Sequence, residues 1–288
     1  MRMRLWTITL MAALLVVAGS TAALAIPSLG GPTGIVTVPT AAVAPMDQLQ
    51  MALTYQSQEM AQEMYGGSAS MDVDYWALNV LTGVAPEAEL WGAYALADQE
   101  SPTMSETATM WAIGGKYQLT REPEDEASLA IGASLEKWSD ALWASGSSMY
   151  GSLTDVDIVK AYIVATKDFT PLTGEGWEWA SGGGTRMLGS VGILYIDVSP
   201  DEGDGDNLTR PFVGLEFVGV GGTTLGLEYR WKDDDLDQKA VFSAVLRHRL
   251  SAEVEAEVGT TNAGPGGLGL DDQDIFVRLG YTVPLGGP

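Results

Sequence analysis

The strongest constraint on the fold is a strict alternation of apolar and polar residues that recurs along the chain. Residues 252–258 read AEVEAEV, residues 225–231 read LGLEYRW and residues 111–119 read WAIGGKYQL. In a strand, successive side chains point to opposite faces, so such a segment has one apolar and one polar face. A helix would scatter the same apolar residues around its axis. The alternation therefore predicts an all-β chain.

About twelve strands are predicted on this basis, and many of them are ten residues or longer. They lie near residues 49–58, 72–84, 88–98, 106–119, 127–139, 154–169, 184–199, 210–221, 223–232, 239–250, 252–262 and 273–285. A tilted strand needs about 9–11 residues to cross a bilayer. An even number of strands places the start of the first strand and the end of the last strand on the same side of the membrane, as in bacterial outer-membrane barrels. We therefore expect an antiparallel transmembrane β-barrel.

The connections between these strands alternate in length, as short periplasmic turns alternate with longer outer loops in such barrels. Tight turns are predicted around Pro86, at Gly221-Gly222 and around Ser251. The long connections are expected at residues 59–71, 140–153, 199–209 and 260–273. The connection at 171–183 is long although it falls on the short side, and it departs from the pattern. The remaining connections support the barrel.

A soluble β-sandwich also alternates and is the competing fold. The length of the strands favours the barrel, and so do Trp and Tyr residues near the strand ends, which suit a membrane girdle. The candidates for this girdle are Tyr75, Trp76, Trp91, Trp111, Tyr117, Trp138, Tyr229, Trp231 and Tyr281. Because Tyr75 and Trp76 are adjacent, part of this set must face inward.

The N-terminus carries the pattern of a cleaved export signal. Arg2 and Arg4 precede an almost unbroken apolar run at 5–18, and small residues follow, ending in Ala23-Leu24-Ala25. The run is shorter than the roughly 20 residues that a spanning helix needs, so cleavage after Ala25 is predicted. The chain then divides into a signal peptide at 1–25, a periplasmic or plug-like segment at 26–48 and the barrel at 49–288. The predicted location is the bacterial outer membrane, with its lipid as a partner.

The composition excludes several classes of function. The formal net charge is −23, and binding to nucleic acid is not expected, because phosphate contacts need clusters of Lys and Arg. The chain has no cysteine, so disulfides, thiolate metal sites and cysteine nucleophiles are excluded. No cofactor is predicted.

Charged residues are predicted on the inner wall of the barrel. A turn centred on Ser251 places Arg249 opposite Glu253 and Arg247 opposite Glu255, as an Arg–Glu ladder that stabilises the pairing. The other lumen-lining candidates are Glu216, Glu228, Arg230, Glu257 and Arg278. Two interpretations stay open. Either these charges satisfy one another and fill the interior, or they line a narrow polar channel and set its selectivity.

Catalytic and metal sites are weakly indicated. His248 is the only histidine, and its parity places it on the outer face, opposite Val254, so an enzyme is not predicted. Asp201, Asp204 and Asp206 form an acidic loop with hard oxygen ligands of the kind that calcium prefers. The loop lacks the EF-hand spacing. Solvated loop charge is therefore the default interpretation, and weak binding of divalent cations at the acidic loops is the alternative.

Residues 31–41 read GPTGIVTVPTA. Gly31 and Gly34 permit a tight bend, and Pro39 disfavours a central strand. We therefore expect this segment to plug or edge the barrel mouth rather than join the sheet. The motif resembles the opening of YjbH-type outer-membrane proteins linked to exopolysaccharide export, and of related uncharacterised barrels. The resemblance implies an outer-membrane barrel and raises a role in polysaccharide export.

Two functions are expected from these features together. The first is a narrow, porin-like passive channel or a purely structural barrel. The alternative is a non-catalytic envelope component associated with exopolysaccharide export.

Overall fold

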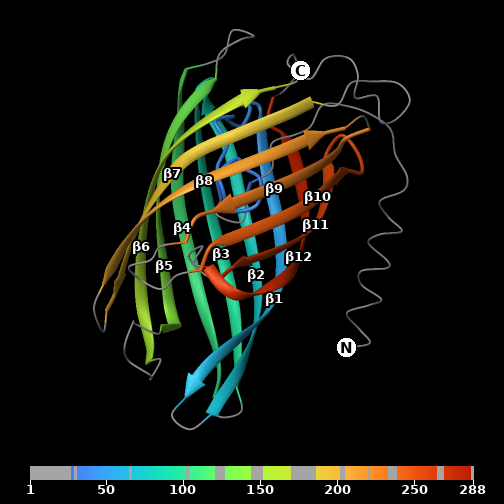
Figure 1. Cartoon of the computed structure of the whole chain (residues 1–288). Helices are drawn as coiled ribbons and strands as arrows, with labels where there is room; N and C mark the ends of the chain where they lie inside the picture. The colour runs from blue at the N-terminus through green and yellow to red at the C-terminus, as the bar shows by residue number, and fades with distance from the viewer. Residues whose placement is uncertain are drawn as a thin grey trace.

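Twelve antiparallel strands form one closed barrel, in which each strand pairs with its neighbours in sequence and β1 pairs with β12 (Figure 1). This computed structural model describes residues 27–28, 31–64, 67–101, 104–120, 127–143, 152–169, 186–201, 205–219, 221–232, 239–264 and 269–286. The strands are β1 (Gln48–Met64), β2 (Gly67–Ala85), β3 (Ala88–Ser101), β4 (Met104–Thr120), β5 (Ser128–Trp143), β6 (Ser152–Asp168), β7 (Arg186–Pro200), β8 (Asp206–Val218), β9 (Thr223–Arg230), β10 (Val241–Arg249), β11 (Val254–Ala263) and β12 (Gly269–Pro284). The predicted fold and number of strands are confirmed. Within the described ranges no helix is long and apolar enough to cross a membrane.

The predicted long connection at 59–71 is wrong. The β1–β2 hairpin continues to the pair Met64 and Gly67, so most of this range is strand. Residues 59–71 are mainly polar or small, and strands that pair beyond the apolar belt do not need an alternating face. A prediction from alternation alone therefore ends these two strands too early. The exceptional connection at 171–183 lies outside the described residues.

Two of the predicted tight turns are present at the end of the barrel where β1 begins and β12 ends. Strands β2 and β3 pair as far as Ala85 and Ala88, on either side of Pro86. Gly221 and Gly222 have φ values of 80° and 77°, a left-handed conformation that glycine adopts at little cost. In bacterial outer-membrane barrels, short turns of this kind lie at the periplasmic end.

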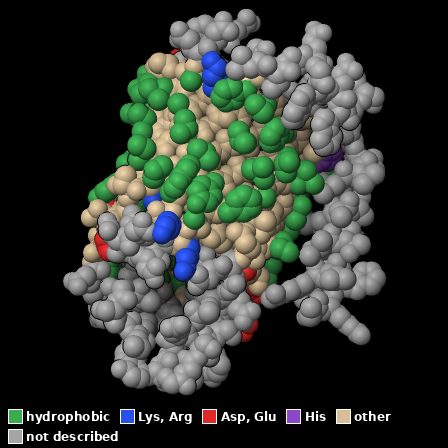
Figure 2. Space-filling view, viewed as in Figure 1, with side chains coloured by type: hydrophobic (Ala, Val, Ile, Leu, Met, Phe, Trp, Pro, Cys, Tyr) green, Lys and Arg blue, Asp and Glu red, His purple; other side chains and the backbone are tan. Residues whose placement is uncertain are grey.

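The outer face of the wall is apolar. Figure 2 shows hydrophobic side chains gathered over the middle of the wall, with charged side chains toward its ends. Exposed members of this belt include Leu53, Trp76, Leu78, Tyr94, Trp111, Ile113, Tyr117, Ile131, Ile163, Ile193, Leu225, Tyr229, Trp231, Phe242, Leu279 and Tyr281. Three of the predicted girdle residues, Tyr75, Trp91 and Trp138, instead line the interior. Alternation along each strand explains the difference, because every second side chain must point inward.

The inner wall contains aromatic rings that lie over glycines of the neighbouring strand. A Cβ atom added at Gly132 would stand 2.3 Å from the ring of Tyr162, its direct cross-strand partner. Among the described strands the pairs are Trp91–Gly114, Tyr162–Gly132, Phe212–Gly192 and Phe276–Gly259. The glycines thus let large rings lie flat against the wall and keep the barrel narrow.

Residues 31–47 are named here the lumenal segment; most of them lie inside the barrel (Figure 1, blue), and Pro45, Met46 and Asp47 are exposed just before β1 begins. Ile35, Val36 and Val38 are buried in one apolar cluster with side chains of the wall. A Cβ atom at Gly214 or Gly226 would stand 2.4 Å or 2.6 Å from the side chain of Ile35. The wall is therefore shaped to receive this segment.

Candidate functional site: the lumen and its N-terminal segment

The lumenal segment folds into a compact loop before it enters β1. The Ile35 N–H donates to the Val38 carbonyl at 3.1 Å, and the Thr40 N–H donates to the Thr33 carbonyl at 3.1 Å. Gly31 has a φ of 103°, so the bend expected at this glycine is present. Because the loop satisfies few of its own backbone groups, the wall must supply the remaining partners.

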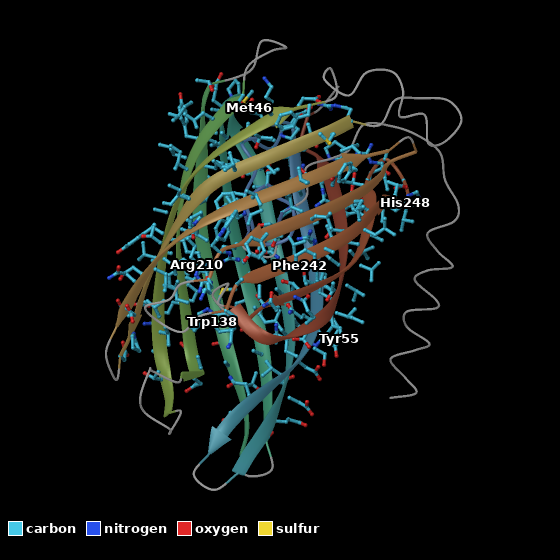
Figure 3. The ribbon with its side chains drawn as sticks, viewed as in Figure 1. Met46, Tyr55, Trp138, Arg210, Phe242 and His248 are labelled. Carbon is cyan, nitrogen blue, oxygen red and sulfur yellow. The ribbon has the colours of Figure 1, made fainter. Side chains whose placement is uncertain are left out.

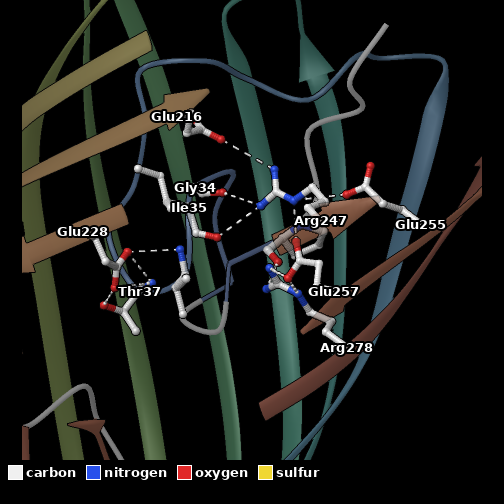
Figure 4. Close-up of polar contacts among 11 residues, drawn as sticks. Gly34, Ile35, Thr37, Glu216, Glu228, Arg247, Glu255, Glu257 and Arg278 are labelled. Atoms are coloured by element: carbon white, nitrogen blue, oxygen red, sulfur yellow. Dashed lines mark hydrogen bonds and ion pairs between the residues drawn. The ribbon is translucent and has the colours of Figure 1, made fainter. Parts of the chain in front are cut away.

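Glu228 of β9 holds the tip of this loop (Figure 4). Its carboxylate accepts hydrogen bonds from the backbone N–H groups of Val36 (3.1 Å), Thr37 (2.9 Å) and Val38 (3.0 Å). It also accepts from the hydroxyls of Thr37 and Ser243. Successive N–H groups that converge on one anion form a nest. The tip is thus bound through its backbone.

A buried ion pair holds the two ends of the loop. Glu89 of β3 and Lys116 of β4 lie 3.0 Å apart, and both side chains are fully buried. Glu89 accepts from the Thr33 N–H at 2.9 Å and from the Ala44 N–H at 2.8 Å. Lys116 donates to the carbonyls of Thr33 and Thr40, both at 3.1 Å. Each charge of the pair therefore also satisfies the segment, which a buried pair needs in order to be stable.

A third group of charges lies beside Gly34 and Ile35 (Figure 4). Arg247 pairs with Glu257 at 2.5 Å and with Glu255 at 3.2 Å. Its Nη2 donates to the Ile35 carbonyl at 3.2 Å. Arg278 pairs with Glu257 and donates to the Pro27 carbonyl. Glu216 completes the group 3.6 Å from Arg247.

The predicted pairing between β10 and β11 is wrong by two residues. Arg249 lies opposite Glu255 and Arg247 opposite Glu257, whereas Glu253 is exposed in the turn. The Ser251 hydroxyl accepts from the N–H groups of Glu253 and Val254, which adds residues to the turn and moves the pairing along. Because the shift is even, the inward face of each strand is unchanged.

His248 consequently lies opposite Ala256 rather than Val254. It sits near the end of β10 (Figure 3) and alternates with the inward Arg247 and Arg249, so it stays on the outer face. Its Nδ1 shares a hydrogen bond of 2.8 Å with the hydroxyl of Thr223, and the residue is buried. His248 therefore lies at the rim of the barrel, where it has Thr223 as a hydrogen-bond partner.

Apart from the exposed Glu253, all the charged residues predicted to line the lumen are buried inside the barrel: Glu216, Glu228, Arg230, Arg247, Arg249, Glu255, Glu257 and Arg278. Sequence analysis missed Glu89 and Lys116. Both could have been found by parity, because Glu89 shares the inward face with Trp91, and Lys116 shares it with Gly114 and Gln118. Single charges among apolar residues were a weaker signal than the repeated Arg and Glu of β10 and β11.

A cavity lies against the lumenal segment, with Thr37, Pro32 and Pro39 on one side. Its other walls include Tyr75, Trp91, Trp138, Tyr162, Glu136, Lys160, Gln56, Gln58 and Arg230. Several of these residues, such as Gln58 and Trp138, lie toward the strand ends that are opposite the start of β1. The cavity is therefore a part of the lumen that lies between the lumenal segment and the strand ends away from the start of β1.

The predicted calcium site stays a prediction. Asp201 and Asp206 are exposed, and Asp204 lies outside the described residues. Over the described ranges, no three acidic or histidine side chains come together in a group that could hold a metal ion.

Comparison with known proteins gives a likeness in structure alone. No family model and no curated protein matches the chain. An outer membrane channel from Pseudomonas putida F1 superposes with a TM-score of 0.56 at 11% identity, over 86% of this chain and 100% of that one. The transport unit of the autotransporter AIDA-I from Escherichia coli superposes with a TM-score of 0.50 at 12% identity, over 82% and 90%. Identities this low show the fold, which is that of a bacterial outer-membrane β-barrel.

Proposed function

We propose that this chain is a narrow passive channel of the outer membrane whose resting state is closed by the lumenal segment. One observation carries the proposal: near the periplasmic end, the lumen is occupied by a separate stretch of chain rather than by wall side chains. The apolar belt contacts outer-membrane lipid, and the lumen carries no catalytic role.

The wall supports a channel over a purely structural barrel. Barrels that are only structural are filled by their own inward side chains. Here glycines lie opposite the segment at Gly214 and Gly226, and the charges around it donate to or accept from its backbone. Withdrawal of the segment leaves a passage lined by these charges, which then act on passing ions.

The test is a deletion of residues 31–44, which removes the loop and keeps Pro45 and Asp47, whose carbonyls accept from Gly83 and Leu285. In planar bilayers the full chain should show little current, and the deletion variant should show a steady conductance. The faster migration of unboiled protein on a gel serves as the control that the variant still forms a closed barrel. A folded deletion variant without current would leave only the structural barrel.

A further inference from the structure

The cavity beside the lumenal segment contains hydrogen-bond donors that the surrounding chain does not use. The indole N–H groups of Trp91 and Trp138 and the hydroxyl of Tyr162 have no partner among the described residues. These side chains are only 4%, 3% and 9% exposed, and all three line the cavity. A buried donor without an acceptor costs about 1–3 kcal/mol, so the site is built for something that supplies acceptors.

The need to place a ring over each glycine of the wall does not explain why these side chains carry donors. Phe212 and Phe276 cover Gly192 and Gly259 with rings that have no polar atom, and neither is among the residues of the cavity wall. At the cavity, the rings that cover glycines are those of Trp91 and Tyr162. The donors therefore occur where the lumen is open to a ligand, and an apolar ring is used where it is not.

The cavity also offers flat apolar surface. The ring of Tyr162 lies with one face on Gly132, which leaves its other face toward the lumen. Tyr75 and Trp138 stack with ring centroids 6.2 Å apart. The faces of aromatic rings carry partial negative charge and attract weakly positive C–H groups. A ligand that presents a face of C–H groups and an edge of oxygens suits this arrangement.

The charged side chains at the cavity already have partners within the chain. Glu136 and Lys160 form an ion pair with each other, and Arg230 donates to the hydroxyl of Thr37, which itself donates to Glu228. An anionic ligand would therefore have to compete with Glu136 for Lys160 and with Thr37 for Arg230, whereas hydroxyl groups can both donate to and accept from such groups. This favours a neutral ligand over a carboxylate.

From this geometry we propose that the cavity is a binding site for a small neutral sugar. A sugar ring has an apolar C–H face for the aromatic side chains and hydroxyl oxygens for the three donors. The site deepens the proposed function, because it names the class of solute that reaches the segment from outside. The proposal rests on that function only for the role of the bound sugar, since the sugar binds while the lumenal segment is still in place.

The test is calorimetric titration of the full chain in detergent with glucose and with maltose, and with benzoate as an anionic aromatic comparison. The variants Trp91→Phe, Trp138→Phe and Tyr162→Phe each keep a ring and remove one donor. Each should weaken sugar binding by about five- to tenfold. Trp111→Phe and Tyr117→Phe change exposed side chains of the outer belt and should leave it unchanged. Gel mobility verifies that every variant is a closed barrel.

Three results would overturn the sugar site: no saturable heat with either sugar, binding that the three lumenal variants leave unaltered, or binding of benzoate alone. Because titration needs no current, a silent deletion variant would refute the channel without touching this result. Equally, a conducting deletion variant combined with a full chain that binds no sugar would refute only the site.

Discussion

At the scale of single residues, Glu228 is the most heavily used contact of the lumenal segment. Glu228→Gln keeps the shape of the side chain but replaces one acceptor oxygen by an amide donor that faces N–H groups. We expect this change to weaken the binding of the segment by about 3 kcal/mol, because hydrogen bonds to charged groups contribute about 1.5–3 kcal/mol each. Hydrogen exchange at the amides of Val36–Val38 should then become roughly 100-fold faster.

The matched control is Glu253→Gln, which changes an exposed carboxylate in the turn between β10 and β11. It should leave the exchange of Val36–Val38 as in the unaltered chain. Equal protection in both variants would mean that the apolar contacts of Ile35, Val36 and Val38 hold the segment without Glu228.

Single residues also show what sequence can and cannot reveal. Parity identified the inward Arg247, Glu255 and Glu257, because alternation is a local property of each strand. It could not reveal that Glu228 binds the backbone of Val36–Val38, since that contact joins residues 190 or more positions apart. Such long-range contacts depend on how the whole barrel closes.

At the scale of elements, the strands were predictable and their outer ends were not. Every predicted range overlaps an observed strand, because the apolar outer face imposes period two. The predicted pairing of β10 with β11 was wrong, because a hydrogen bond from the Val254 N–H to the Ser251 hydroxyl sets the length of that turn. Turn geometry of this kind leaves no periodic trace in the sequence.

The ring–glycine pairs of the inner wall lead to a prediction about neighbouring strands. Gly132→Ala places a methyl group 2.3 Å from the ring of Tyr162, so β5 or the ring must move. We expect a loss of about 1–3 kcal/mol in the free energy of unfolding, measured by denaturant titration in micelles. Gly92→Ala is the control, because the nearest atom there is 3.6 Å away. Equal losses at both positions would show that the ring contact does not matter.

At the scale of the whole molecule, alternation and the even number of strands predict a closed barrel, but they do not reveal its contents. The sequence left open whether the charges fill the interior or line a channel. In the structure Arg278 and Glu257 satisfy each other, while Glu89 and Lys116 bind a further stretch of chain. The alternation of apolar and polar residues shows which face of each strand points inward, but it does not show what occupies the interior of the barrel.

The lumenal segment is covalently continuous with β1 at Gln48, and this attachment has a kinetic consequence. A tethered group meets its site at an effective concentration in the millimolar range. The segment would therefore return quickly after each release, and even modest contacts keep the passage shut most of the time. Added in solution to the deletion variant, a peptide of residues 31–44 should half-block the current at roughly 0.1 mM, since contacts that need millimolar peptide would leave the tethered segment withdrawn about half of the time. Block at micromolar concentration would show that its contacts, and not its tether, keep the barrel closed.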